Sequence, residues 1–172
     1  MNLTGPTSRL ADNAQKAIKA GANALLFNVL SYGYDVLHEL SRNPEIKVPI
    51  MAHPAMAGAF YPSPYYGISA SLLLGKLMRL AGADIVLFPS PYGSVVMPRE
   101  ENMAIKEALL TGSLPVRTCF PVPSAGIHPG LVPGSSETSA AKSSSTPVEE
   151  STAILWVRLP GDEPSARLWQ PH

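Results

Sequence analysis

The sequence predicts an α/β fold in which short parallel strands alternate with helices. Four short runs are apolar on both faces, which is typical of parallel strands covered by helices. These runs recur roughly every 25–35 residues, the spacing of right-handed strand–helix–strand units. They cover about 24–28, 48–52, 84–88 and 117–122.

The stretches between these runs have apolar residues three and four positions apart, which predicts amphipathic helices. Three such stretches cover about 8–20, 67–81 and 99–111, and a shorter one lies near 33–42. Strand and helix therefore alternate along the first 133 residues. A length of 172 residues corresponds to about one domain.

Composition and charge exclude several classes of partner. The 13 basic and 13 acidic residues cancel, so the chain lacks the basic excess that nucleic-acid binding requires. No apolar run reaches the roughly 18 residues of a membrane-spanning helix, so we expect no membrane partner. Cys119 is the single cysteine, which excludes an internal disulfide framework and a cysteine-cluster metal site. This cysteine usage fits the cytoplasm, where thiols are kept reduced.

The composition changes near Gly134. Residues 134–172 contain eight serines and no sustained apolar periodicity. Such a segment buries too little apolar surface to offset the entropy lost on ordering. We therefore predict a folded unit over 1–133 and a disordered tail over 134–172.

Small and polar residues follow the ends of the predicted strands. Asn28 ends the first run, His53-Pro54 follows the second, Ser90 follows the third, and Ser124-Ala125-Gly126 follows the fourth. The carboxyl ends of parallel strands are where barrel and open-sheet enzymes build their sites. The pattern predicts a small-molecule site along one edge of the sheet.

Each of these residues also has a purely structural interpretation. His53 taken alone is slightly more typical of a histidine whose ring bonds a neighbouring carbonyl. The turn at 124–126 is equally compatible with a capping serine and with a nest of backbone N–H groups that holds a phosphate. The residues by themselves therefore predict an α/β protein with a candidate phosphate-binding turn.

Six longer strings of sequence run in order through 1–133. They are NLTG (2–5), GANALLFNV (21–29), PIMAHPA (49–55), LLGKL (73–77), FPSPYGS (88–94) and VPSAGIHPG (122–130). Together these strings resemble the C-terminal barrel of the RuBisCO-like proteins, and within them the enolase branch of methionine salvage. The resemblance implies a partial (β/α)8 TIM barrel, about strands 3 to 7 of the RuBisCO-type C-terminal domain.

Two positions favour the enolase branch over the carboxylase. The motif that contains His53 reads His-Arg in carboxylases, where the arginine grips a second phosphate, whereas Pro54 stands here. The carboxylase also has a mobile loop with a catalytic lysine, whereas residues 89–94 contain no lysine. A site without these cations suits a monophosphate substrate and proton abstraction beside a carbonyl. A carboxylase-type segment is the weaker alternative.

The resemblance also implies roles for particular residues. In the family, Mg²⁺ is held by a carbamylated lysine and two acidic residues of a Lys-Asp-Asp-Glu-like motif, and another lysine is the general base. This chain contains neither motif, and we expect Met1 to lie near the end of the third barrel strand. By resemblance His53 contacts the enolate side of the substrate, and Ser124 with Gly126 forms part of a phosphate cradle. We assign no catalytic residue and no metal ligand, and the family implies homodimers.

The tail departs from the family, and a shifted reading frame accounts for the departure. Family members continue to a second phosphate loop of the type Asn-Ala-Gly-Gly-Gly-Ile-His-Gly-His-Pro. In a shifted frame, each codon consists of the last base of one residue's codon and the first two bases of the next residue's codon. Codons of this kind permit the family string over 145–155. We therefore interpret 134–172 as read out of frame.

Two hypotheses of function follow. In the first, the chain is part of an enolase that acts on 2,3-diketo-5-methylthiopentyl 1-phosphate and is inactive alone. In the second, it is a non-catalytic remnant that at most binds a phosphate.

Overall fold

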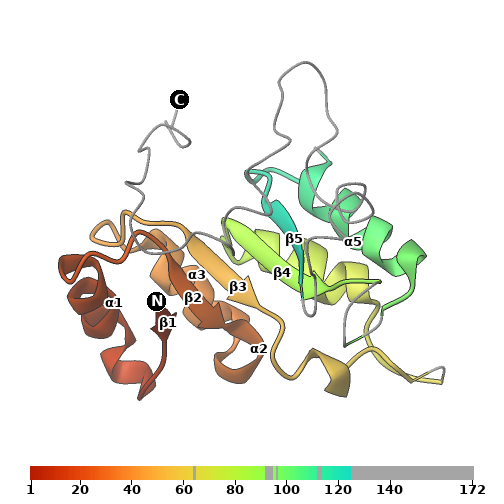
Figure 1. Ribbon diagram of the computed structural model, residues 1–172, viewed down its shortest axis with the longest axis horizontal. Coiled ribbons are helices and arrows are strands. Elements are labelled where there is room, and N and C mark those ends of the chain that lie inside the picture. Colours follow the sequence, from red (N-terminus) through yellow and green to blue (C-terminus); the bar gives the residue numbers. More distant parts are fainter. Residues whose placement is uncertain (64, 92–94, 96, 112–113, 125–172) are drawn as a thin grey trace, which may run out of the picture.

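The computed structural model describes residues 1–63, 65–91, 95, 97–111 and 114–124. Within them lies a parallel sheet of five strands in the order β1-β2-β3-β4-β5, so each strand pairs with the next one in the sequence (Figure 1). The predicted α/β fold with parallel neighbours is confirmed. The strands are β1 (Asn2–Leu3), β2 (Leu25–Asn28), β3 (Ile50–His53), β4 (Ile85–Pro89) and β5 (Phe120–Ser124).

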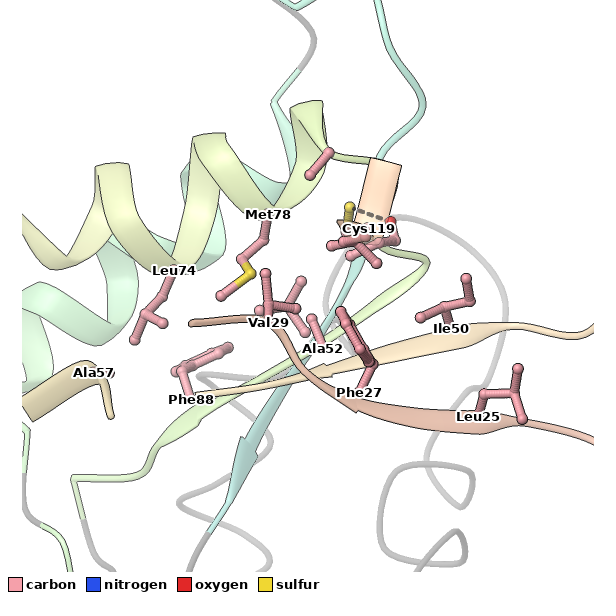
Figure 2. Packing of buried hydrophobic residues seen from close by; sticks show 14 of the residues in the cluster. Leu25, Phe27, Val29, Ile50, Ala52, Ala57, Leu74, Met78, Phe88 and Cys119 are labelled. Atoms are coloured by element: carbon pink, nitrogen blue, oxygen red, sulfur yellow. Dashed lines mark hydrogen bonds between the residues drawn. The ribbon is translucent and has the colours of Figure 1, made fainter. Parts of the chain in front are cut away.

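Helices connect the strands and pack on one face of the sheet. In β2, β3 and β4 every second side chain, including Phe27, Ala52 and Phe88, joins the core beneath Leu74 and Met78 (Figure 2). Burial of these side chains on the helix side is the main apolar stabilisation of the fold. The helical segments are η1 (Thr7–Arg9), α1 (Leu10–Lys19), α2 (Val29–Tyr32), α3 (Tyr34–Arg42), η2 (Ala57–Ala59), the π-helical η3 (Ser71–Lys76), α4 (Leu77–Leu80) and α5 (Arg99–Leu110).

The opposite face of the sheet carries a separate apolar cluster that contains strand residues alone. Met51, Leu87 and Val122 are buried there. The strand register places side chains from four successive strands in one row across this face. The row consists of Leu26, Met51, Ile85 and Phe120.

A row of this kind is the layered packing of a barrel interior. A doubly wound sheet would instead have helices on both faces and a reversal of strand order. Sequential strand order, helices on one side and layered side chains on the other together define a partial (β/α)8 barrel, as predicted. We refer to the helix-free side as the inner face.

Two strands begin two or three residues later than the sequence predicts. β3 begins at Ile50 rather than at 48, and β5 begins at Phe120 rather than at 117. Before β5, the carbonyls of Val116 and Arg117 accept hydrogen bonds from the buried guanidinium of Arg79, at 2.9 and 2.7 Å. These two carbonyls therefore bond to a side chain instead of to the backbone of β4.

The helix predicted over 67–81 begins at Ser71 as η3 and continues as α4. The loop before it closes on itself, because the N–H of Ile68 donates to the carbonyl of Phe60 at 2.9 Å. Gly67 has a φ of 140°, and a Cβ there would lie 2.4 Å from that carbonyl oxygen, so only glycine fits this closure.

The predicted boundary near Gly134 lies outside the described residues. A search of the described helices finds none with the length and apolar character needed to cross a membrane.

Candidate functional site

The carboxyl ends of the strands bring the sequence-predicted residues to one edge of the sheet. Asn28 and His53 end β2 and β3 and are register partners. Pro89 and Ser124 end β4 and β5 and are register partners as well. Because strand side chains alternate between faces, these four continue the positions of Leu26, Met51, Leu87 and Val122 on the inner face. We call this set of four residues the carboxyl edge.

His53 has a defined hydrogen-bonding state. Its Nδ1 accepts the backbone N–H of Ala55 at 3.1 Å. An imidazole nitrogen that accepts cannot carry a proton, so the proton of the neutral ring lies on Nε2. The ring is half-buried, and desolvation lowers the pKa of His53 from its usual 6.5. At neutral pH His53 is therefore a neutral side chain that offers an Nε2–H donor.

This state predicts a pH dependence of stability. The pKa of His53 is lower in the folded chain than in the unfolded chain, so the unfolded chain takes up the proton first as the pH falls. The contribution of His53 is therefore complete above about pH 6.5 and declines as the pH falls below that value. We expect long-range ¹⁵N–¹H NMR spectra to show the Nε2–H form at pH 7 and a midpoint below 6.5. A midpoint above 6.5, or a proton on Nδ1, would contradict this assignment.

Ser124 lies half-buried at the end of β5, and its backbone ties two strand ends together. The N–H of Ser90, a fully buried residue after β4, donates to the carbonyl of Ser124 at 3.0 Å. This bond holds the exits of β4 and β5 at a fixed separation. Gly126, the other predicted member of the phosphate turn, lies outside the described residues.

Further contacts brace the loops after β1, β2 and β3, and sequence reasoning did not find them. The ring of Tyr32 stacks on Phe27 with centroids 5.1 Å apart, and its hydroxyl bonds both the N–H and the carbonyl of Gly5 at 3.1 Å. The hydroxyl of Ser31 donates to the sulfur of Met56 at 3.5 Å. Aromatic residues after an apolar run were the available signal, but their partners are distant in the sequence.

The acidic residues do not gather at the carboxyl edge. Asp84 lies beside the amino end of β4, where its Oδ2 accepts the N–H of Ile50 at 2.9 Å. Asp35 and Glu39 are exposed on α3. Among the described residues no three His, Cys, Asp or Glu side chains are grouped so that they could hold a metal ion. The described residues therefore do not fit the Mg²⁺ site that the resemblance implies, and we derive no step through it.

Solved structures of one class of protein share this arrangement. A rubisco-like protein (MtnW) from Alicyclobacillus acidocaldarius matches with a TM-score of 0.73 and 52% identity, over 79% of this chain and 34% of that one. The octameric ribulose-1,5-bisphosphate carboxylase/oxygenase of Pyrococcus horikoshii matches with a TM-score of 0.72 and 29% identity, over 80% of this chain and 32% of that one. The fold described above is thus that of one part of a RuBisCO-type barrel.

Curated relatives narrow this class. The 2,3-diketo-5-methylthiopentyl-1-phosphate enolase of Geobacillus kaustophilus is 60% identical over 133 residues, and that of Bacillus cereus is up to 58% identical over the same length. These residues are 77% of this chain and 32% of each relative, so the chain spans about a third of the length of the relatives it matches. No protein-family model matches the chain. By sequence and fold, the chain is related to the enolase branch of the RuBisCO-like proteins.

Proposed function

We propose that this chain supplies one edge of an active site that enolises a phosphorylated vicinal diketone. The relatives' names identify such a compound, 2,3-diketo-5-methylthiopentyl 1-phosphate. The observation that carries the proposal is the state of His53 at the carboxyl edge. A neutral Nε2–H is suited to donate a hydrogen bond to an oxygen that becomes negative when a neighbouring carbon loses its proton. The same state makes His53 a poor base, because neither nitrogen has an uncommitted lone pair.

The phosphate end of the substrate is assigned to the turn that follows β5. Ser124 and Gly126 flank this turn in the sequence, and a strand-to-helix turn offers backbone N–H groups to an anion. The bond between Ser90 and Ser124 fixes the carboxyl end of β5, immediately before Ala125 and Gly126 in the sequence. In this proposal His53 binds the carbonyl end of the substrate, and the turn binds its phosphate.

The proposal assigns the enolase reaction rather than ribulose-bisphosphate carboxylation. Pro54 has no charge with which to grip a second phosphate, and residues 89–94 contain no lysine to stabilise a carboxylated intermediate. Without these cations, transition-state binding of a bisphosphate would be poor. The proposed setting is the cytoplasm, in agreement with the single cysteine, which is buried and donates to the carbonyl of Ala83.

A hybrid enzyme tests the proposal. In this hybrid, the 133 matched residues of this chain replace their counterparts in the Geobacillus kaustophilus enolase. We expect the hybrid to enolise 2,3-diketo-5-methylthiopentyl 1-phosphate, whereas the 172-residue chain alone, given Mg²⁺ and bicarbonate, shows no turnover because it lacks the family's base and Lys-Asp-Asp-Glu motif. The measurement is the ultraviolet absorbance of the enol product.

The control is the unmodified Geobacillus enzyme in the same assay. A folded hybrid without turnover would favour the non-catalytic alternative, in which this segment at most binds a phosphate. Carboxylation of ribulose bisphosphate by the hybrid would show that Pro54 and the lysine-free loop do not exclude the carboxylase reaction. Turnover by the chain alone would contradict the division of the site proposed here.

A further inference from the structure

Asn28 presents its side chain on the inner face, beside His53. In β2, Leu25 and Phe27 are fully buried on the helix side, whereas Leu26 packs against the inner cluster. The alternation continues to Asn28, which is half-buried at the end of the strand. The amide of Asn28 therefore lies on the inner face, on the same side of β2 as Leu26 and at the carboxyl end of the strand.

The side chain of Asn28 has no structural partner in the described part of the chain. The residue occupies the N-cap position of α2, where asparagine usually accepts a hydrogen bond from an N–H of the first turn. Here the cap makes no side-chain hydrogen bond, with φ at −82° and ψ at 80°. The common structural reason for an asparagine at this position is absent, and the amide is available to a ligand.

The register places this amide next to the donor on His53. Asn28 and His53 are direct partners in neighbouring parallel strands, whose backbones lie about 4.8 Å apart. His53 offers one N–H donor, and the amide of Asn28 offers two more as well as an acceptor oxygen. Both groups are uncharged near neutral pH, so the pair carries no net charge of its own.

We propose that Asn28 is a substrate-binding residue that, together with His53, hydrogen-bonds the two adjacent carbonyl oxygens of a vicinal diketone. This inference rests on the proposed function and adds to it the group that selects for the second carbonyl. Oxygens on adjacent carbons require two neighbouring donors, and two adjacent strands supply them. A substrate with one carbonyl would leave one donor partly desolvated and unpaired, which is the usual source of strong discrimination between polar ligands.

Ligand binding by the 172-residue chain tests this inference without requiring turnover. The probes are 2,3-diketopentyl 1-phosphate and 2-ketopentyl 1-phosphate, which share the phosphate and differ in one carbonyl. We expect the wild-type chain to bind the diketone about tenfold more tightly in an NMR titration, with the side-chain amide signals of Asn28 moving for the diketone. Asn28→Leu should bind both probes with nearly equal affinity.

Two further variants keep the test interpretable. Asn23→Leu changes an exposed asparagine before the other end of β2 and should retain the tenfold preference. Asn28→Asp has the same shape but no N–H donors, and both probes carry the same phosphate, so its added charge cancels in the ratio. Asn28→Asp should lose the preference for the diketone. If circular dichroism shows that Asn28→Leu is unfolded, Asn28→Asp decides the result.

The possible outcomes separate this inference from the function on which it rests. If His53→Ala weakens binding of both probes and Asn28→Asp retains the preference for the diketone, the role of Asn28 is wrong and the proposed function stands. If neither probe binds the wild-type chain or the hybrid enzyme, or if both bind without any dependence on His53, the proposed function fails and the role of Asn28 fails with it.

Discussion

Replacement of Arg79 by methionine is expected to lower the free energy of unfolding by about 3–5 kcal/mol. Arg79 is 2% exposed and lies on α4. Its guanidinium donates to four backbone carbonyls, two near the end of α5 and two in the segment before β5. The acceptors are Ala108 at 3.2 Å, Thr111, Val116 at 2.9 Å and Arg117 at 2.7 Å.

The size of this effect follows from what the substitution leaves behind. Methionine has a similar volume but no donor, so several carbonyls would lose a charge-assisted partner away from water. The cation also faces the carbonyl end of α5, where the helix dipole favours positive charge. Arg79→Lys keeps the charge, but its compact ammonium group cannot donate to all four carbonyls. This variant should therefore recover only part of the lost stability.

Urea unfolding followed by circular dichroism measures this prediction. Lys76→Met is the matched control, because Lys76 is exposed three residues earlier on the same helical segment and its replacement should change stability by less than about 0.5 kcal/mol. A loss below about 1 kcal/mol for Arg79→Met would show that the carbonyls find other partners.

The second large effect is expected at His53 in the hybrid enzyme. His53→Ala should reduce kcat about 100- to 1000-fold, because it removes a donor aimed at an oxygen that gains charge in the transition state. KM should change less, since the ground-state carbonyl oxygen gains less from that hydrogen bond than the enolate does. His53→Gln can place an N–H close to the position of Nε2 and should restore part of the loss.

His38→Ala is the control for this experiment, because His38 is exposed on α3. It should leave kcat within about twofold of the parent hybrid. A reduction of kcat by less than about threefold in His53→Ala would contradict the donor role. An equal effect of His38→Ala would indicate that the loss reflects stability rather than chemistry.

The existence, type and order of the main elements could be predicted from the sequence because they depend on local patterns. Runs that are apolar on both faces mark β2, β3, β4 and β5, and the periodicity of three and four residues marks α1, α3 and α5. The position of His53 and Ser124 at strand ends follows from the same patterns. Given parallel strands, their meeting at one edge is a geometric consequence.

Element boundaries and the state of the site were decided by contacts between residues far apart in the chain. Nothing in the local sequence indicates that the carbonyls of Val116 and Arg117 bond to Arg79, and this contact sets the start of β5. The resemblance gave His53 a place at the substrate, but the sequence does not specify the donor on Nε2, which depends on the orientation of the ring toward the N–H of Ala55.

The sequence by itself determined that this chain forms alternating strands and helices with polar strand ends, because apolar periodicity fixes which residues can be buried. Only the tertiary structure decided that the helices share one face and that Asn28 lies beside His53. Connections of one hand between sequential neighbours place the helices on one face, and strand register places Asn28 beside His53. A shift of one residue between β2 and β3 would turn every side chain to the other face, and that choice is made by the whole core rather than by either strand.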